Sequence, residues 1–273
     1  MTVCAQCYSD PLMRDLAALW TNRHLVASLA RQDLRRTHAG TAAGVAWAVL
    51  TPLVPLVCFT AVFSLGLRLP LGDGPYVLGF AAAYVPWVLM STAVTSAVGS
   101  IVDHRYLVKR VRFPLQIISA SSVIVQSLPH AILLVLTIAA AVASGHARLP
   151  ELLLLPYFYG CAAVLVLGVG LMLSGLAVIA RDVQQLLASF LTVWFWITPV
   201  AWAAGALPPG GQALLALNPA AYVISGYRHA LMPRAFAAPP ATDAIAFWVI
   251  AAGFLLVGAA LFRRLRPHFW ECL

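Results

Sequence analysis

Charged residues are scarce in this 273-residue chain: Asp, Glu, Lys and Arg together make up 10% of it, where a soluble globular domain carries about 25%. Hydrophobic residues make up 62%. The few charges leave long stretches with none, and about 20 apolar residues are enough to cross a bilayer as a helix. The scarcity of charge excludes an ordinary water-soluble fold and predicts an all-α polytopic membrane protein.

The stretches without charge indicate six transmembrane helices, at about 44–66, 76–99, 115–144, 152–179, 183–204 and 243–262. The fifth stretch continues without charge to residue 227, which is longer than one crossing needs. Pro199, the run Pro208-Pro209-Gly210-Gly211 and Asn218-Pro219 interrupt it. We therefore expect the fifth span to end near residue 204 and re-entrant helices to follow on the outer face, before the sixth span.

The basic residues are unevenly distributed over the segments between these spans. Thirteen of the seventeen fall in segments that lie on one side if six helices cross, and the other four are Arg68, Arg148, Arg228 and Arg234. The positive-inside rule then places both termini in the cytoplasm of a multi-pass protein. Basic residues spread over membrane-flanking segments do not indicate a nucleic-acid partner.

The segment before the first span, residues 1–36, is expected to form a domain of its own. Its apolar residues fall on one helical stripe, formed by Leu12, Leu16, Leu19, Val26, Ala30 and Leu34. This pattern predicts an amphipathic helix at the cytoplasmic membrane surface, although Arg23 interrupts the stripe and leaves packing against protein as an alternative. Residues 37–273 then form the six-span transmembrane domain.

Groups for catalysis, metal binding or energy supply are also lacking. No two of the nine carboxylates lie within four residues of each other, and Cys4 and Cys7 supply only half of a zinc site. Apart from Asp243 at the edge of the sixth, the predicted spans carry no Asp, Glu, Lys or Arg, which disfavours coupling to an ion gradient. The only lysine, Lys109, is not in a phosphate-binding loop. We expect no metal or cofactor in this chain, and if the protein moves something uphill, its energy must come from another polypeptide.

Several motifs then follow one another along the chain in a recognisable order. They are Asp33-Leu34-Arg35, Leu107-Val108-Lys109-Arg110-Val111-Arg112-Phe113-Pro114, Arg181-Asp182-Val183, Trp194-Phe195-Trp196-Ile197-Thr198-Pro199-Val200, Leu217-Asn218-Pro219, Tyr227-Arg228 and Phe262-Arg263-Arg264-Leu265-Arg266-Pro267-His268-Phe269. With these motifs the sequence resembles the permease subunit of a type-2 ATP-binding-cassette (ABC) exporter for polysaccharides.

The resemblance implies a homodimer joined to two cytoplasmic ATPase subunits, which bind the ATP and Mg. Such a permease moves undecaprenyl-linked polysaccharide, of the O-antigen, capsule or teichoic acid type, across the bacterial inner membrane and is surrounded by membrane lipid. Two other hypotheses stay open. One is export of a drug or small lipid by a related exporter, and the other is an integral membrane enzyme that modifies glycans or lipids.

The resemblance also assigns the loop 101–112 as the helix that couples the permease to the ATPase. The candidate coupling residues are Asp103, Arg105, Tyr106, Lys109 and Arg110. A positive-inside signal with no partner would account for the same basic residues.

Aromatic side chains are the candidates for a saccharide path, because their faces stack on sugars without deep charged traps. They are Trp47, Phe59, Phe63, Tyr84, Trp87, Trp194, Phe195 and Trp196. Interfacial anchoring and packing are the alternatives for these residues.

Two smaller features complete the candidate sites. Arg181 and Asp182 form a charge pair expected to orient the fifth span, the acid being favoured at a helix N-terminus. The breaks at Pro208, Pro209, Asn218 and Pro219 resemble the gate helices of polysaccharide exporters, and shielding of the channel wall from lipid is the alternative.

Overall fold

The computed structural model describes residues 23–38, 46–66, 71, 73–106 and 116–269, and within these ranges the regular structure is helical. Four helical segments have the length and the apolar composition to cross a membrane. They are α4 (Tyr76–Asp103), α6 (Gln116–Ala143), α8 (Leu155–Ile179) with the short α7 (Leu149–Leu152) before it, and α12 (Ala241–Leu265). The chain is therefore a multi-pass membrane protein.

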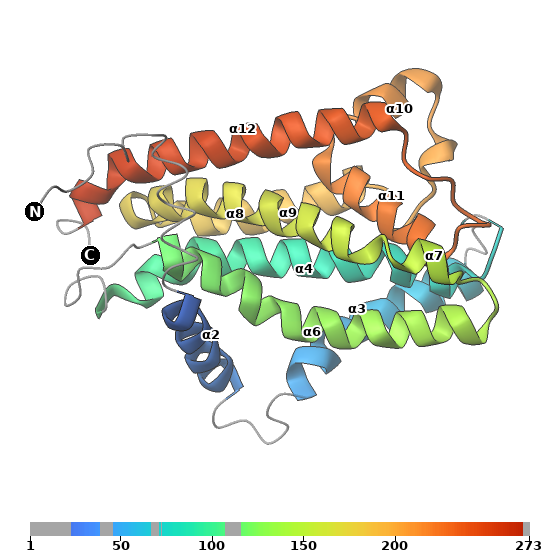
Figure 1. Ribbon diagram of the computed structural model, residues 1–273, viewed down its shortest axis with the longest axis horizontal. Coiled ribbons are helices and arrows are strands. Elements are labelled where there is room, and N and C mark those ends of the chain that lie inside the picture. The colour runs from blue at the N-terminus through green and yellow to red at the C-terminus, as the bar shows by residue number, and fades with distance from the viewer. Residues whose placement is uncertain (1–22, 39–45, 67–70, 72, 107–115, 270–273) are drawn as a thin grey trace, which may run out of the picture.

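Helix α4 forms the centre of the bundle and packs against both α6 and α8. Its fully buried residues include Phe80, Ala82, Ala83, Ala93 and Val98. Small residues along the helix let its neighbours approach closely, as is common between membrane helices. The long helices run side by side, with the C-terminal ends of α4 and α12 at one end of the molecule and α7, α10 and α11 at the other (Figure 1).

Helices α8 and α12 make the closest backbone approach, at two facing glycines. A Cβ atom on Gly168 would lie 2.8 Å from the backbone nitrogen of Leu255, and one on Gly258 would overlap the carbonyl oxygen of Gly168. Only glycine leaves room for this contact. It is a membrane helix pair held by small residues at the crossing point.

Two apolar helices, α3 (Trp47–Thr60) and α9 (Asp182–Ile197), lie at the edge of the bundle. A π-helical turn, η2 (Ala61–Gly66), continues α3. Many of their large apolar side chains are exposed, and Val57 and Leu186 are 64% and 68% accessible. The two helices correspond to the predicted first and fifth spans.

The helix in the predicted fifth span stops before residue 204. Helix α9 ends at Ile197, not near residue 204, because Thr198 is already extended, with φ −83° and ψ 136°. Proline disfavours the helical conformation for the residue before it, and Pro199 follows Thr198.

Short helices follow α9, in the region where the sequence indicated re-entrant elements. They are η3 (Ala204–Ala206), α10 (Pro209–Leu215) and α11 (Pro219–Leu231). Both α10 and α11 begin with proline, which is favoured at the first helical position because its missing N–H would have no partner there. Helix α11 is largely buried, whereas none of the residues of α10 is buried.

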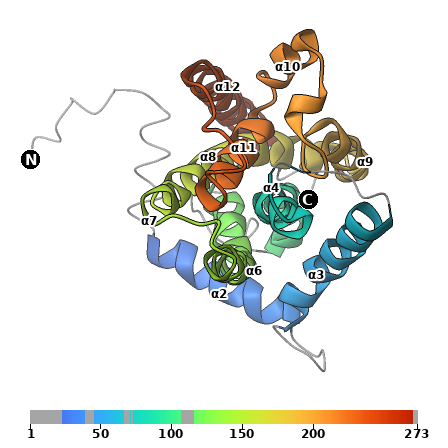
Figure 2. The same cartoon turned by 90° about the vertical axis from the view of Figure 1, so that its right-hand side faces the viewer.

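The N-terminal helix α2 (Arg23–His38) packs on α6 and lies across the direction of the long helices (Figure 2). Val26 and Ala30, on the predicted apolar stripe, are buried, while Leu25 is half exposed. At least this part of the stripe therefore packs against protein. Leu12, Leu16 and Leu19 of the stripe lie outside the described residues.

The glycine contact between α8 and α12 predicts unequal effects of two identical substitutions in α12. The variant Gly258→Ala should lower the thermal unfolding midpoint in detergent, by the equivalent of about 2 kcal/mol, because overpacking displaces α8. Gly253→Ala is the control, because nothing lies within 4 Å of a Cβ atom there. The control should keep or raise the midpoint, since alanine favours helix over glycine. Equal midpoints for the two variants would contradict the close approach.

Candidate functional site

Aromatic rings from α3, η2, α4 and α9 gather on one side of the bundle. The ring of Phe59 lies at its centre, with centroids 6.0 Å from Phe63, 5.5 Å from Phe195 and 6.0 Å from Trp196. Trp87 of α4 contacts Phe195 and Trp194, each at 5.6 Å. Helices α3 and α9 flank this side of the bundle with α4 behind them (Figure 2). These six residues are predicted path residues that come from separate parts of the chain.

An open groove of about 310 Å³, which we call the aromatic groove, lies among these rings. Its lining residues are Phe59, Tyr84, Trp87, Ser91, Leu191, Thr192, Phe195 and Trp196. Five of the eight predicted path residues line it. Trp194 and Phe63 contact those lining residues from outside, and Trp47 is half exposed at the start of α3 and is not part of the lining.

The chemistry of the aromatic groove is that of a weak binding surface. Its lining carries ring faces and the hydroxyls of Tyr84, Ser91 and Thr192, but no charged side chain. Within the described ranges, no three His, Cys, Asp or Glu side chains gather where a metal ion would fit. Uncharged aromatic surfaces bind polyhydroxylated or amphipathic molecules without holding them tightly.

Asn218, a predicted gate residue, joins the end of α9 to the start of α11. Its Oδ1 accepts from the indole nitrogen of Trp194 at 3.0 Å and from the backbone nitrogen of Ala220 at 3.1 Å. Its Nδ2 donates to the hydroxyl of Thr198 at 2.9 Å. Asn218 therefore caps α11 and fixes it to α9. Pro219 begins α11, and Pro208 and Pro209 are exposed where α10 begins.

Arg228 of α11 is buried, 3% accessible, and donates three hydrogen bonds to backbone carbonyls. The acceptors are Gly79 of α4 at 3.1 Å, Val200 at 2.7 Å and Trp202 at 3.2 Å. Its guanidinium also lies 5.1 Å from the ring centre of Phe236. In the sequence Arg228 belongs to the Tyr227-Arg228 motif and to the four basic residues predicted on the outer side, whereas in the structure it ties α11 and the segment after α9 to α4.

The predicted coupling residues lie where α4 ends. Asp103 is the last residue of α4, and Arg105 and Tyr106 follow it; all three are exposed. The ring of Tyr106 lies 6.2 Å from the ring of His104. Lys109 and Arg110 lie outside the described residues.

His104, which the sequence analysis did not single out, connects this end of α4 to α2. Its Nδ1 is 2.8 Å from the carbonyl oxygen of Ser100, and its Nε2 is 2.9 Å from Oδ1 of Asp33. A neutral imidazole has one N–H, so two facing oxygens require a second proton on the ring or on the carboxyl group. With the second proton on the ring, His104 and Asp33 form an ion pair, which joins α2 to the end of α4 directly before Arg105. Asp33 belongs to a quoted motif, but nothing in the sequence links it to a residue 71 positions away.

Arg181 and Asp182 lie at the start of α9, with Asp182 as its first residue. Both side chains are exposed, and these two described residues form no hydrogen bond or ion pair with each other. The position of Asp182 suits the positive end of the helix dipole. Its role in orienting α9 stays a prediction.

Four long apolar helices, with an uncharged aromatic groove at the edge of the bundle, define a polytopic membrane protein. The chain belongs to the ABC-2 type transporter family, whose model matches residues 24–232. It is thus the membrane component of an ABC transporter.

Curated relatives cover nearly the whole chain. The O-antigen export system permease protein RfbA of Myxococcus xanthus is 24% identical over 264 residues, which are 96% of this chain and 100% of that protein. RfbA of Klebsiella pneumoniae is 23% identical over 252 residues, 91% of this chain and 95% of its own length. The polysialic acid transport protein KpsM of Escherichia coli is 20% identical over 239 residues, 87% of this chain and 92% of its own length.

The contact between Asp33 and His104 predicts coupled effects on stability. Asp33→Asn and His104→Gln should each lower the unfolding free energy by about 1–3 kcal/mol, because each change breaks the same partly buried, charge-assisted contact. The double variant should be no less stable than the less stable of the two single variants, because both changes remove the same contact. Thermal unfolding in detergent measures all three. Asp103→Asn, at an exposed acid on the same helix end, is the control and should leave the midpoint unchanged. Additive losses in the double variant would contradict the contact.

Proposed function

We propose that this chain is the permease subunit of a homodimeric exporter that moves undecaprenyl-linked polysaccharide outward across a bacterial inner membrane. Separate cytoplasmic ATPase subunits bind ATP and Mg and supply the energy. The observation that carries the proposal is the uncharged aromatic groove between α3, α4 and α9, in a chain of the ABC-2 family. The names of the relatives, which refer to O-antigen export and polysialic acid transport, favour a polysaccharide over a drug.

The exposed apolar faces of α3 and α9 support the homodimer. Val54 and Val57 on α3, and Phe190 and Val193 on α9, are more than half exposed. A second copy of the chain facing these helices would cover the apolar surface and enclose the aromatic groove. Two copies related by a two-fold axis would then line a channel with four aromatic-bearing helices.

The membrane topology that goes with this function has six spans. The four long helices would be joined by α3 with η2 and by α9, as the first and fifth spans. Together α3 and η2 cover residues 47–66, enough for about 30 Å as a helix, whereas the 16 residues of α9 reach only about 24 Å. The turns and bends that follow Ile197 would complete the fifth crossing. Both termini would lie in the cytoplasm, and α10 and α11 would be re-entrant elements at the outer face.

The coupling role belongs to the segment after α4. Asp103, Arg105 and Tyr106 are exposed and would enter the ATPase with Lys109 and Arg110. Basic residues and one aromatic ring suit a compact contact with a second protein. The contact between Asp33 and His104 would pass motion of this segment to α2.

The gate role is best supported for α10. Asn218 and Arg228 tie α11 to α9 and α4, whereas α10 is exposed along its length. The start of α10, at Pro208 and Pro209, would move at the exit of the channel, and Asn218 and Pro219 would form its fixed base.

Two neighbouring residues of α9 test the role of the aromatic groove. Trp196 lines the groove and Ile197 does not, and both are at least half exposed. Trp196→Ala should lower ATP-driven uptake of lipid-linked glycan into inverted vesicles by roughly 3- to 10-fold, since ring stacking contributes about 0.5–1.5 kcal/mol. Ile197→Ala should leave uptake within two-fold of the parent chain. Equal uptake by both variants, or uptake of a small lipid but no glycan, would contradict the proposal.

Cysteine labelling tests the topology. In a background without native cysteines, Gly211→Cys in α10 and Arg266→Cys after α12 should react with an impermeant maleimide from opposite sides of the membrane. In the six-span topology only α12 crosses the membrane between these two positions, and a single crossing requires this difference. Labelling of both positions from the same side would rule out six spans.

A further inference from the structure

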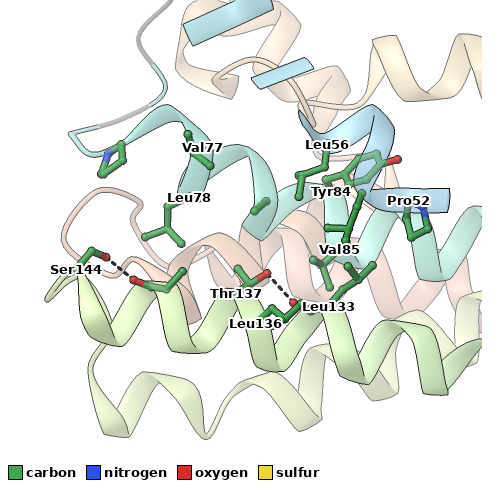
Figure 3. A pocket seen from close by; sticks show the side chains of 14 residues that line it. Pro52, Leu56, Val77, Leu78, Tyr84, Val85, Leu133, Leu136, Thr137 and Ser144 are labelled. Carbon is green, nitrogen blue, oxygen red and sulfur yellow. Dashed lines mark hydrogen bonds between the residues drawn. The ribbon is translucent and has the colours of Figure 1, made fainter. Parts of the chain in front are cut away.

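A second groove, which we call the lateral groove, lies between α3, α4 and α6 and has a volume of about 320 Å³. Its wall is apolar and is built by Pro52, Leu53, Leu56, Pro75, Val77, Leu78, Ala81, Tyr84, Val85, Leu133, Leu136, Thr137, Ala140 and Ser144. The hydroxyls of Thr137 and Ser144 donate to carbonyls of their own helix, at 2.8 and 2.7 Å (Figure 3). The protons of these hydroxyls are therefore not available to a polar ligand, and the lateral groove suits a hydrocarbon chain.

The dimensions of the lateral groove match one leaflet of a bilayer. On α6 its lining runs from Leu133 to Ser144, and on α4 from Pro75 to Val85. At about 1.5 Å per residue either stretch is about 15 Å long, which is half of a hydrocarbon core of about 30 Å. Both helices have the length and composition of membrane spans, and Val77 and Leu136 of the lining are about half exposed. The groove therefore runs parallel to lipid chains and is open to them from the side.

Polar and charged groups lie at one end of the lateral groove, where α6 ends and α4 begins. Nδ1 of His146 is 3.1 Å from the hydroxyl of Ser144. The same ring lies over the start of α4, since a Cβ atom on Gly74 would be 3.4 Å from its Nε2. Arg148, two residues after His146, and Asp73, beside Gly74, are both exposed. This end offers hydrogen-bonding groups, a cation and an anion at the depth of lipid headgroups.

We propose that the lateral groove binds one acyl chain of a zwitterionic glycerophospholipid. The phosphate lies beside His146 and Arg148, and the ammonium group lies beside Asp73. The charge pattern favours such a lipid over phosphatidylglycerol, because Asp73 attracts the ammonium group, which phosphatidylglycerol lacks. The second acyl chain stays in the surrounding bilayer.

The bound chain has a structural consequence for the aromatic groove. Tyr84 lines both grooves, and Pro52, Leu53 and Leu56 of α3 form one wall of the lateral groove. A lipid chain that fills the space under α3 holds this helix at a fixed separation from α4 and α6. Occupancy by lipid thereby sets the width of the neighbouring aromatic groove.

Two adjacent alanines of α6 provide a matched test. Ala140 lines the lateral groove and Ala139 does not, and both are exposed, so a larger side chain at either position leaves the core intact. The full chain is reconstituted in nanodiscs with equal parts phosphatidylethanolamine and phosphatidylglycerol, extracted in detergent, and analysed by native mass spectrometry for retained lipid.

We expect the parent chain and Ala139→Phe to retain phosphatidylethanolamine and Ala140→Phe to retain at least five-fold less. Arg148→Gln should also reduce retention, with an unchanged unfolding midpoint in lipid-free detergent. Equal retention by the two phenylalanine variants would overturn the site. Preferential retention of phosphatidylglycerol, or of a polyprenyl phosphate from the expression host, would overturn the proposed occupant. The measurement needs neither ATPase nor glycan, so its result is independent of the proposed export function.

Discussion

Where a helix breaks inside or next to a membrane, its freed backbone carbonyls need donors from the protein, because hydrocarbon supplies none. After α9 Arg228 meets this need, and Asn218 fixes the same region through contacts with side chains and with the start of α11. Arg228 donates to the carbonyls of Val200, Trp202 and Gly79, and Asn218 binds Thr198 and Trp194 while it caps α11. The early end of α9, the burial of α11 and the position of the Trp194 ring behind the aromatic groove all depend on these contacts.

The two grooves have opposite chemistry although they share Tyr84 and lie on either side of α3. One is lined by stacked rings and free of charge, which suits a polymer that must slide past repeated weak contacts. The other is aliphatic and suits a stationary hydrocarbon chain. A single loosely packed helix therefore separates the surface assigned to cargo from the surface assigned to lipid.

The positions of the helices could be predicted from the sequence, because stretches without charge mark them directly. Residues 76–99 and 243–262, predicted as spans, lie within α4 and α12. Five of the eight aromatic residues predicted for a saccharide path line the aromatic groove, and their role in transport stays a prediction. The roles of Arg228, Asn218 and His104 could not be predicted in this way. Each depends on partners far away in the chain, and a basic residue near a span end looks the same in a sequence whether it faces water or a buried carbonyl.

The facing glycines of α8 and α12 bring two backbones into direct contact, with no side chain between them. The two helices resist small separations, because a narrow gap between closely packed backbones would be a void too small for lipid to fill. The pair of α8 and α12 therefore forms a rigid part of the subunit, and other helices move relative to it. The elements free to shift against this pair are then at the rim of the subunit, where α3 and α9 pack against few other helices.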